Sequence, residues 1–476
     1  MKEKSYDEVY DEMEKGMSNM LVLGRAGSGK SYLIRKLCEK KKDIILAAPT
    51  GIAAMNIGGR TIDSIFGFKP YSNIFTMPLI TDESLFMFQN SSILLIDEIS
   101  MVRFNTLDRV SDILMTVRRN ELPFGGLRLM FFGDLHQLEP VVNDYEESII
   151  FGQYMEYNGD AGFYKARVML KDDFFMKSFN KYFLTHNFRQ KNDLNYQNIL
   201  NEVRTGELSD NTLDILNNQY KDTKDYIQLY NEGNHFLTLS NKTMNIINRT
   251  IIDKLPGDCF TSEPIRINLK NNYKIIERNK INNTIEMKEG MKVMFVVNDM
   301  GVNRRWANGT IGTIVEINQS NGVVHSVKIK IKKDDNEIIY DVGKIKIDIY
   351  GLINNEPEVV YNIINFPFLP CIATTIDKMQ GMTIEKAAIV LDRKVTRPNL
   401  IYVALSRVIE LSNLLILERK LTHNDIIVSG KIEGFLNSIK EQLISVFYKT
   451  EKINHKKIKV RKRDNNNVNL KQSISA

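Results

Sequence analysis

The strongest chemical signal in the sequence is a glycine-rich segment near its start. An apolar run, residues 19–23, leads into Gly-Arg-Ala-Gly-Ser-Gly-Lys-Ser at 24–31, and an amphipathic stretch follows. Glycines let a loop fold tightly with its N–H groups facing phosphates, and a helix starting there adds its positive dipole end. Lys30 is expected to reach the β and γ phosphates and Ser31 to ligate Mg²⁺. The remaining cradle residues are expected to be Gly24, Gly27, Ser28 and Gly29.

Two later apolar runs also end in polar residues. Asp97 and Glu98 follow residues 93–96, and the loop containing Gln137 follows residues 127–132. Open parallel sheets bind ligands at the carboxyl ends of their strands. Asp97 would then hold the Mg²⁺ water shell, Glu98 would polarise an attacking water, and Gln137 would contact both water and γ-phosphate. The three segments together predict one nucleotide site on a parallel sheet.

The composition limits the number of domains and shows where the net charge lies. Its 476 residues are 43% hydrophobic, enough for two to four domains with buried cores. The net charge of +6 lies in residues 450–476, whereas residues 1–449 hold 56 basic and 56 acidic side chains. We expect this basic end to be disordered, either as a solubilising end or as a phosphate-binding or nuclear-address element.

The sequence contains no run of about 18 apolar residues, the length that a membrane span needs. The acidic first fifteen residues argue against a signal peptide. We therefore expect an intracellular, soluble protein that has no membrane partner, with a nuclear location or a viral or host-cytoplasmic one left open.

A change of pattern marks a separate region in the second half. Residues 286–355 alternate at period two, and Asn321-Gly322 is a hairpin turn signal. This predicts a small antiparallel β domain. A purely structural insertion and one that helps to hold a ligand are equally compatible with the pattern.

Six segments, taken together, resemble the motifs of the Pif/RecD-like superfamily-one DNA helicases in order and spacing. The Pif branch fits best, because its signature segment resembles residues 107–126, and the resemblance runs from about residue 20 to 410. The six segments are APTGIAAMNIGGRTIDSIFGF (48–68), LLIDEISMV (94–102), PFGGLRLMFFGDLHQLEPV (123–141), NFRQ (187–190), TTIDKMQGMT (374–383) and YVALSRV (402–408).

The resemblance implies an α/β fold with two RecA-like P-loop NTPase lobes and an inserted Src-homology-like antiparallel β-barrel. ATP would bind as substrate, with Mg²⁺, in the cleft between the lobes. The expected division is lobe one at 1–180, lobe two at 181–285 with 356–445, the insertion at 286–355, and the basic tail at 446–476.

The resemblance also implies residue roles in lobe two. Arg189 and Arg407 would reach the γ-phosphate as arginine fingers, so hydrolysis would be fast only with the cleft closed. Gln380 is assigned both to the nucleotide and to the residues that hold single-stranded DNA. Residues expected to hold single-stranded DNA are Thr50, Gly51, Thr61, Thr375 and Gly381.

The sequence departs from the family pattern in the DNA-binding motifs. Asp63 and Asp377 stand where the family usually has histidine, and a carboxylate repels phosphate. They would contact base N–H groups, pair with Lys378 and Arg60, or weaken the grip on DNA. Neither is counted as a DNA contact. Phe66 and Phe68 could stack on bases, but we expect them in the core.

The predicted function is an ATP-dependent DNA helicase that moves 5′ to 3′ on single-stranded DNA. Its partners would be single-stranded and tailed duplex DNA, with unidentified replication, repair or recombination proteins. Three alternatives stay open: an RNA-directed superfamily-one helicase, a nucleotide-gated DNA clamp that does not unwind, and a RecD-like subunit of a nuclease. Comparing how strongly DNA and RNA stimulate ATP hydrolysis would distinguish an RNA-directed helicase from the predicted DNA helicase.

Overall fold

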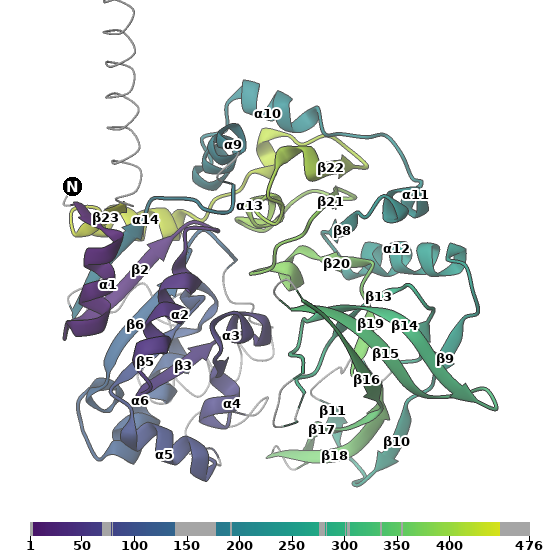
Figure 1. The fold of residues 1–476 in the computed structure, drawn as a ribbon, viewed down its shortest axis with the longest axis horizontal. Helices are drawn as coiled ribbons and strands as arrows, with labels where there is room; N and C mark the ends of the chain where they lie inside the picture. The colour runs from purple at the N-terminus through teal and green to yellow at the C-terminus, as the bar shows by residue number, and fades with distance from the viewer. Residues whose placement is uncertain are drawn as a thin grey trace, which may run out of the picture.

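The computed structural model shows two parallel sheets with flanking helices and a third, antiparallel part (Figure 1). The basic residues 450–476 lie outside the described residues. No helix within the described part of the chain is long and apolar enough to cross a membrane. The described residues are 3–68, 78, 80–138, 178–190, 193–275, 281, 283–299, 301, 305–333, 336–353 and 356–447.

Lobe one is built on an eight-stranded sheet in which every described pairing is parallel. Alternate residues of the central strand enter different cores: Met20 and Val22 pack into one hydrophobic cluster, Leu21 and Leu23 into another. Such a sheet is buried on both faces, which explains the nearly continuous apolar strands. Its order is β1 (Glu3–Ser5), β23 (Leu443–Phe447), β7 (Phe179–Leu184), β2 (Asn19–Gly24), β6 (Arg128–Gly133), β5 (Ile93–Ile96), β3 (Ile44–Ala48) and β4 (Arg60–Thr61).

Helices cover both faces of this sheet (Figure 1). Residues of the first three helices contribute to the core on one face, and those of α5, α6 and α14 contribute to the core on the other or pack against it. The helices are α1 (Tyr6–Lys15), α2 (Lys30–Lys40), α3 (Gly51–Ile57), α4 (Ile62–Phe66), α5 (Asp82–Asn90), α6 (Phe104–Arg118) and α14 (Gly430–Ile439).

The far edge of this sheet differs from the division expected from sequence. β7 pairs with β2, so residues 181–184 lie in lobe one rather than lobe two. β23 fits between β7 and β1, which places the end of the described chain in the first lobe as well. Both strands join the sheet from distant parts of the chain, and no local pattern encodes such pairings.

Lobe two contains a four-stranded parallel sheet in the order β20 (Ala373–Thr375), β8 (His235–Thr238), β21 (Ala387–Val390) and β22 (Leu414–Leu417). Leu237 and Ile389 face one core, and Phe236 and Ala388 face the other. The surrounding helices are α9 (Leu194–Thr205), α10 (Asp210–Asn217), α11 (Tyr226–Asn231), α12 (Asn241–Lys254) and α13 (Leu400–Leu405).

The third part is antiparallel and extends on both sides of the predicted 286–355. One sheet has the order β16 (Asn336–Gly343), β15 (Val323–Lys333), β14 (Ile311–Ser320), β13 (Lys292–Phe295) and β19 (Phe368–Pro370). The second has the order β10 (Ile265–Asn268), β18 (Glu356–Asn365), β17 (Ile345–Ile353) and β11 (Lys274–Ile275). A separate pair joins β12 (Ile285–Met287) to β9 (Phe260–Ser262).

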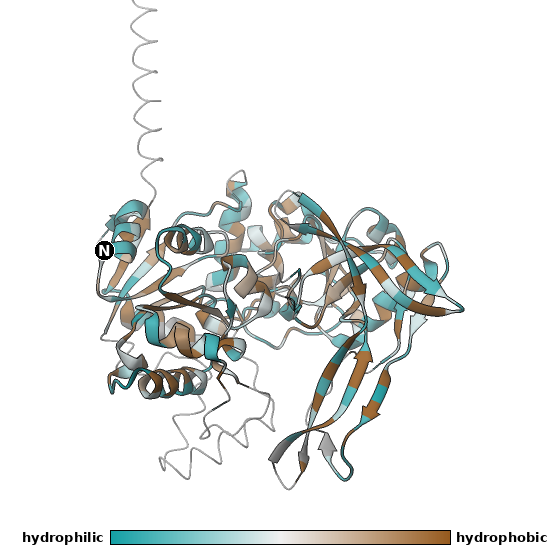
Figure 2. Ribbon diagram, turned by 60° about the horizontal axis from the view of Figure 1, so that its bottom comes forward, coloured by the Kyte–Doolittle hydropathy of each residue, from teal (hydrophilic) through white to brown (hydrophobic). Residues whose placement is uncertain are grey.

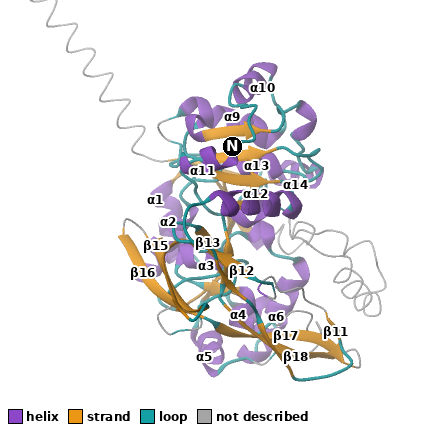
Figure 3. Ribbon diagram, turned by 90° about the vertical axis from the view of Figure 1, so that its right-hand side faces the viewer, coloured by secondary structure: helices purple, strands orange, loops and turns teal. Residues whose placement is uncertain are grey.

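These two sheets stay open in the described residues, so the predicted closed barrel does not form there. Figure 3 separates them, with β15 and β16 on one side and β11, β17 and β18 on the other. Hydrophobic and hydrophilic residues alternate along the long strands (Figure 2). The predicted hairpin turn is confirmed: Asn321 and Gly322 join β14 to β15 with φ of 50° and 77°, the left-handed values that this turn needs.

A buried histidine in lobe two gives a testable pH dependence. His235 Nε2 lies 2.7 Å from Thr374 Oγ1, and burial, with Lys292 adding to it, lowers the pKa of His235 to about 3. Between pH 6.5 and 3 the unfolded chain therefore binds more protons at this site, so stability falls as the solution is acidified. At pH 5 the loss is roughly 2 kcal/mol. Thermal unfolding at pH 7 and pH 5 should show a smaller acid-induced drop in Tm for His235→Gln. Equal drops would contradict this.

Candidate nucleotide site and DNA channel

The glycine-rich segment forms the loop expected of a phosphate cradle. β2 ends at Gly24 and α2 begins at Lys30, and Gly27 and Gly29 have φ of 80° and 88°. Lys30 Nζ donates to the carbonyl oxygens of Gly24 at 2.7 Å and Arg25 at 3.0 Å. The ammonium group is therefore held inside the loop that it is predicted to serve.

Asp97 and Glu98 lie beside this loop at the end of β5. The Asp97 carboxylate is 3.5 Å from Ser31 Oγ and accepts the backbone N–H of Glu98 at 2.9 Å. Burial, together with the neighbouring Glu98, raises the pKa of Asp97 to about 7. A hydroxyl and a carboxylate at this spacing are hard oxygen ligands of the kind Mg²⁺ prefers.

Glu98 is surrounded by positively charged groups from different parts of the cleft. It adopts a left-handed φ of 51°, and its Oε2 is buried with no hydrogen-bond partner among the described residues. Burial raises the pKa of Glu98, whereas three cations oppose that shift: Lys30, Arg407 and Arg189. Lys30 comes from the phosphate loop, Arg189 from the loop after β7 and Arg407 from the segment just after α13.

Arg189 belongs to a loop that spans the cleft. The N–H of Phe188 donates to the Gly27 carbonyl at 2.8 Å, in the phosphate loop. On the other side, Arg189 donates to the Ser406 carbonyl at 3.1 Å, and Gln190 Nε2 donates to the Val408 carbonyl at 3.0 Å. The predicted NFRQ segment thus touches both the cradle and the residues around Arg407.

Arg407 is anchored within lobe two. Its guanidinium donates to carbonyls of Val403 at 2.8 Å, Met379 at 3.2 Å and Met382 at 3.1 Å, and to Ser406 Oγ at 2.7 Å. The side chain is 1% exposed. Burial and the charge of Arg189 lower the pKa of Arg407 to about 10, so it remains a cation at neutral pH.

Gln137 is also buried in the cleft. Its Oε1 has no hydrogen-bond partner in the described part of the chain, and its backbone carbonyl accepts from Asn399 Nδ2 of lobe two at 3.3 Å. An unsatisfied buried amide oxygen is costly unless a ligand or water pairs with it. This fits the predicted contact with nucleotide or attacking water.

Close packing at Gly27 predicts a large effect for a small substitution. A Cβ there would lie 2.5 Å from Arg189 Cβ and 2.7 Å from Asn187 Oδ1. Gly27→Ala should weaken ATP binding about tenfold or more, since a shift costing about 1.4 kcal/mol is already tenfold. Gly290→Ala is the control, because Gly290 has the same φ of 80° but open space around it. Equal ATP dissociation constants for the two variants would contradict this reading.

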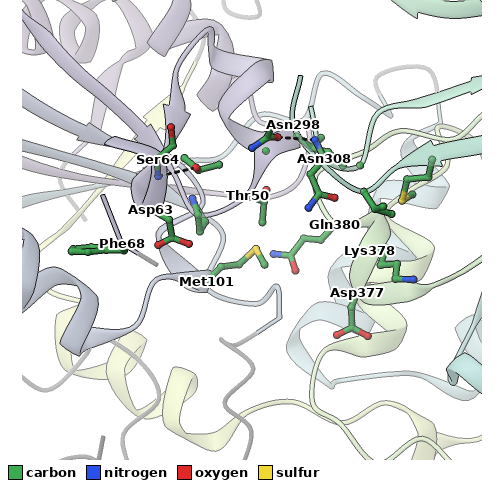
Figure 4. Close-up of a pocket in the computed structure, with 17 residues that line it drawn as sticks. Thr50, Asp63, Ser64, Phe68, Met101, Asn298, Asn308, Asp377, Lys378 and Gln380 are labelled. Atoms are coloured by element: carbon green, nitrogen blue, oxygen red, sulfur yellow. Dashed lines mark hydrogen bonds between the residues drawn. The ribbon is translucent and has the colours of Figure 1, made fainter. Parts of the chain in front are cut away.

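A cavity of about 740 Å³ opens where lobe one, lobe two and the antiparallel part meet. Figure 4 shows Thr50, Met101 and Gln380 between Asp63 on one side and Asp377 on the other. The antiparallel part contributes Asn298, Asn308 and Gly309 among others, and a Cβ on Gly51 would lie 3.0 Å from both Asn298 Oδ1 and the Asn308 carbonyl.

The predicted DNA contacts divide into two groups. Thr50, Gly51, Thr61 and Gln380 line this cavity, whereas Thr375 and Gly381 are not among its lining residues. The hydroxyls of Thr50 and Thr61 accept from the first turns of α3 and α4 and retain a proton to donate. Both amide atoms of Gln380 are buried without a partner in the described residues, so the side chain can still take one.

The two aspartates that depart from the family pattern differ in their surroundings. Asp377 is neutralised by Arg397 at 2.5 Å, not by Lys378 as considered from sequence. Arg60, the other candidate partner, pairs with Glu83. Burial raises the pKa of Asp63, opposed by Arg103 and Arg109.

Phe66 and Phe68 also differ in their surroundings. Phe66 is fully buried and stacks on Phe88 with ring centroids 4.8 Å apart, as predicted for a core residue. Phe68 is partly buried against the same core, with its ring centroid 5.9 Å from that of Phe66, and it also lines the cavity, where the Arg109 guanidinium lies 4.2 Å from its ring. The Phe68 ring thus lies at the border between the core and the cavity.

Sequence reasoning missed a second group of residues in the cleft. The Tyr402 hydroxyl of α13 donates to Asp134 after β6 at 2.9 Å, and Arg204 of α9 lies 3.6 Å from the same carboxylate. Tyr402 stands in the same motif as Arg407, which could have drawn attention to it. Arg204 lies outside every motif, and no local signal distinguishes it from other helical arginines.

Comparison with known proteins gives one consistent result. Residues 2–214 match the family model for PIF1-like helicases. The ATP-dependent DNA helicase Pif1 of Bdellovibrio bacteriovorus is 27% identical over 82% of this chain and 82% of its own length. The ATP-dependent DNA helicase RRM3 of Saccharomyces cerevisiae is 26% identical over 71% of this chain, which spans only 45% of that protein.

Solved structures agree. The crystal structure of Bacteroides Pif1 bound to single-stranded DNA superposes with a TM-score of 0.74 at 26% identity, covering 92% of this chain and 96% of the other. The Bacteroides enzyme in complex with ADP-AlF3 and single-stranded DNA gives 0.73 at 26% identity, covering 91% and 96%. With the two parallel sheets, these matches confirm a RecA-like helicase fold, and over residues 2–214 the chain resembles the PIF1-like helicases.

Proposed function

We infer that this chain is an ATP-dependent DNA helicase. The observation that carries the inference is that the loop holding Arg189 bonds both to Gly27 of the phosphate loop and to Ser406 next to Arg407, which brings both arginines near Glu98. The names of the relatives, and the DNA and nucleotide analogue bound to the Bacteroides enzyme, support the same activity. A protein that only binds DNA does not need a carboxylate and two arginines assembled where two lobes meet.

We propose the following roles within the site. Ser31 and Asp97 would hold Mg²⁺, whose charge offsets that of the β and γ phosphates when it is bound. Gly24, Gly27, Ser28 and Gly29 would cradle the phosphates through their backbone. Lys30 would move from its loop carbonyls to the phosphates, Glu98 and Gln137 would orient the attacking water, and the two arginines would neutralise charge developing on the transferring group.

Coupling to movement follows from where these groups lie. Opening duplex DNA costs about 1.4 kcal/mol per base-pair step, so energy has to be supplied in small increments. ATP would close the cleft by bringing the arginines onto the γ-phosphate, and hydrolysis would release them. If each closure moves one lobe along the strand, one cycle advances the protein by a small step. We propose 5′-to-3′ polarity.

The cavity shared by all three parts is the proposed path of single-stranded DNA. Thr50, Thr61 and Gln380 supply hydroxyl and amide groups for backbone contacts that do not read sequence. Because Asn298, Asn308 and Gly309 line it too, we propose that the antiparallel part is the family's Src-homology-like domain and covers the strand. Thr375 and Gly381 would act from beside the cavity.

Strand separation on tailed duplexes tests this proposal. Duplex DNA with a 5′ single-stranded tail should unwind in the presence of ATP, and a 3′-tailed duplex should not. An RNA-tailed duplex should stimulate hydrolysis less, which separates a DNA helicase from an RNA-directed one. Glu98→Gln serves as the inactive control. DNA-stimulated ATP hydrolysis without strand separation on any substrate would instead support a nucleotide-gated clamp.

A further inference from the structure

A buried carboxylate at the lobe boundary takes its main partners from the opposite lobe. Asp134, just after β6, is 1% exposed. One carboxylate oxygen accepts from the Tyr402 hydroxyl at 2.9 Å, and the other lies 3.6 Å from a guanidinium nitrogen of Arg204. Tyr402 is on α13 and Arg204 in the last turn of α9, both in lobe two.

Lobe one provides fewer close polar contacts to the Asp134 carboxylate. The backbone N–H of His136 donates to it at 3.2 Å, and the His136 ring nitrogen lies 3.9 Å away. Burial and the charge of Arg204 lower the pKa of His136 to about 4, so the ring is neutral near pH 7. Burial alone would raise the pKa of Asp134, and Arg204 and Lys30 hold it below its usual value. Separating the lobes would therefore leave a buried anion without its nearest cation, which is unfavourable.

The two partners of Asp134 are mechanically joined to an arginine finger. Tyr402 lies on α13 and Arg407 two residues beyond its end, and the Tyr196 hydroxyl of α9 donates to the Leu405 carbonyl at 2.7 Å. Asp134 lies three residues before Gln137 in the same loop. Docking α9 and α13 on Asp134 thus fixes the place of Arg407 relative to Gln137 and Glu98.

We propose that Arg204 and Tyr402 are positioning residues that dock lobe two on Asp134 and so bring Arg407 to the transferring phosphoryl group. This proposal rests on the ATPase activity inferred above. Neither residue needs to touch ATP. Each acts by favouring the closed arrangement of the cleft, so its removal lowers the fraction of bound ATP that meets both arginines.

The test compares Arg204→Met and Tyr402→Phe with the unmodified protein in ATP hydrolysis at saturating single-stranded DNA. We expect kcat to fall about 10- to 100-fold for Arg204→Met and less for Tyr402→Phe, the range that misplaced catalytic groups produce. The KM for ATP should change less than about threefold, since a positioning residue does not contribute ground-state binding. Arg204→Lys should recover part of kcat because the charge is kept. Adding Asp134→Asn to Arg204→Met should cost less than the two single effects multiplied, as expected for directly coupled residues.

Arg249→Met is the matched control, because Arg249 is an exposed arginine of lobe two that also pairs with carboxylates. Unchanged kcat in a folded Arg204→Met protein would overturn the proposal, and so would a rise in KM at constant kcat. If Arg204→Met fails to fold, Tyr402→Phe, which removes one oxygen atom, decides the question by the same criteria. Absence of ATP hydrolysis in the unmodified protein would instead refute the proposed function, and with it this inference.

Discussion

Replacing Arg407 with alanine is expected to lower kcat for DNA-stimulated ATP hydrolysis by about 10³- to 10⁵-fold, the range typical of arginine fingers. The reason is that Arg407 is a buried cation from lobe two acting on Glu98 beside the phosphate loop. Steady-state ATPase assays with saturating single-stranded DNA would measure the loss. Binding of ATP itself should weaken much less, because Lys30 and the loop backbone remain in place.

Arg407 also holds its own lobe together, so this prediction needs a structural control. Its bonds to the carbonyls of Val403, Met379 and Met382 are lost in the alanine variant, which should lower Tm. Arg407→Lys keeps the charge but not the planar set of donors, and it should still lose most of kcat. Arg249→Ala, at an exposed site, should leave both quantities near those of the unmodified protein. A folded Arg407→Lys protein with full activity would contradict the assigned role.

Glu98→Gln is expected to lower kcat by about 10²- to 10⁴-fold, the usual contribution of a general base. The substitution is isosteric, and it removes a buried negative charge from a place where the γ-phosphate is predicted to lie. ATP should therefore bind at least as tightly as before, and Tm should not fall, because burial already disfavours the ionised form of Glu98. Single-turnover hydrolysis and equilibrium nucleotide binding would measure the two effects separately.

Glu39→Gln provides the comparison, since Glu39 is an exposed carboxylate on α2 of the same lobe. It should change neither kcat nor nucleotide affinity. If Glu98→Gln hydrolysed ATP within about threefold of the unmodified rate, Glu98 would not be the general base. Asp97, or a water molecule held by Gln137, would then be the remaining candidate for that role.

The positions of many residues in the proposed nucleotide site could be predicted because they follow directly from local patterns. Lys30, Asp97 and Gln137 each come just after an apolar strand, and parallel strands bring such positions to one edge of a sheet. Asn321-Gly322 was predictable for a similar reason, since the turn geometry is set by those two residues alone.

What the sequence could not show depends on contacts between distant segments. β23 joins lobe one beside β1, more than 400 positions earlier in the chain, and only the folded sheet brings them together. The antiparallel part likewise takes β10 and β18 from outside the predicted 286–355, because the strands pair with each other across that range. Arg204 carries no signal at all until α9 is packed against the cleft.

The two aspartates that depart from the family pattern differ in how their negative charges are offset. Asp377 is paired with Arg397, so its negative charge is offset beside the DNA cavity. Asp63 lines the same cavity, with Arg103 and Arg109 as the cations that favour its ionised form. A carboxylate facing single-stranded DNA suits base N–H groups better than phosphates.

A crystal structure of the chain with single-stranded DNA, ADP and aluminium fluoride would show directly whether the two lobes share one catalytic cleft. Guanidinium nitrogens of Arg189 and Arg407, with Lys30 Nζ, should then lie within about 3 Å of the fluoride atoms or the β-phosphate. The opposite result is the analogue held by Lys30 alone, with Arg407 still donating only to its partners in lobe two and Arg189 only to the Ser406 carbonyl.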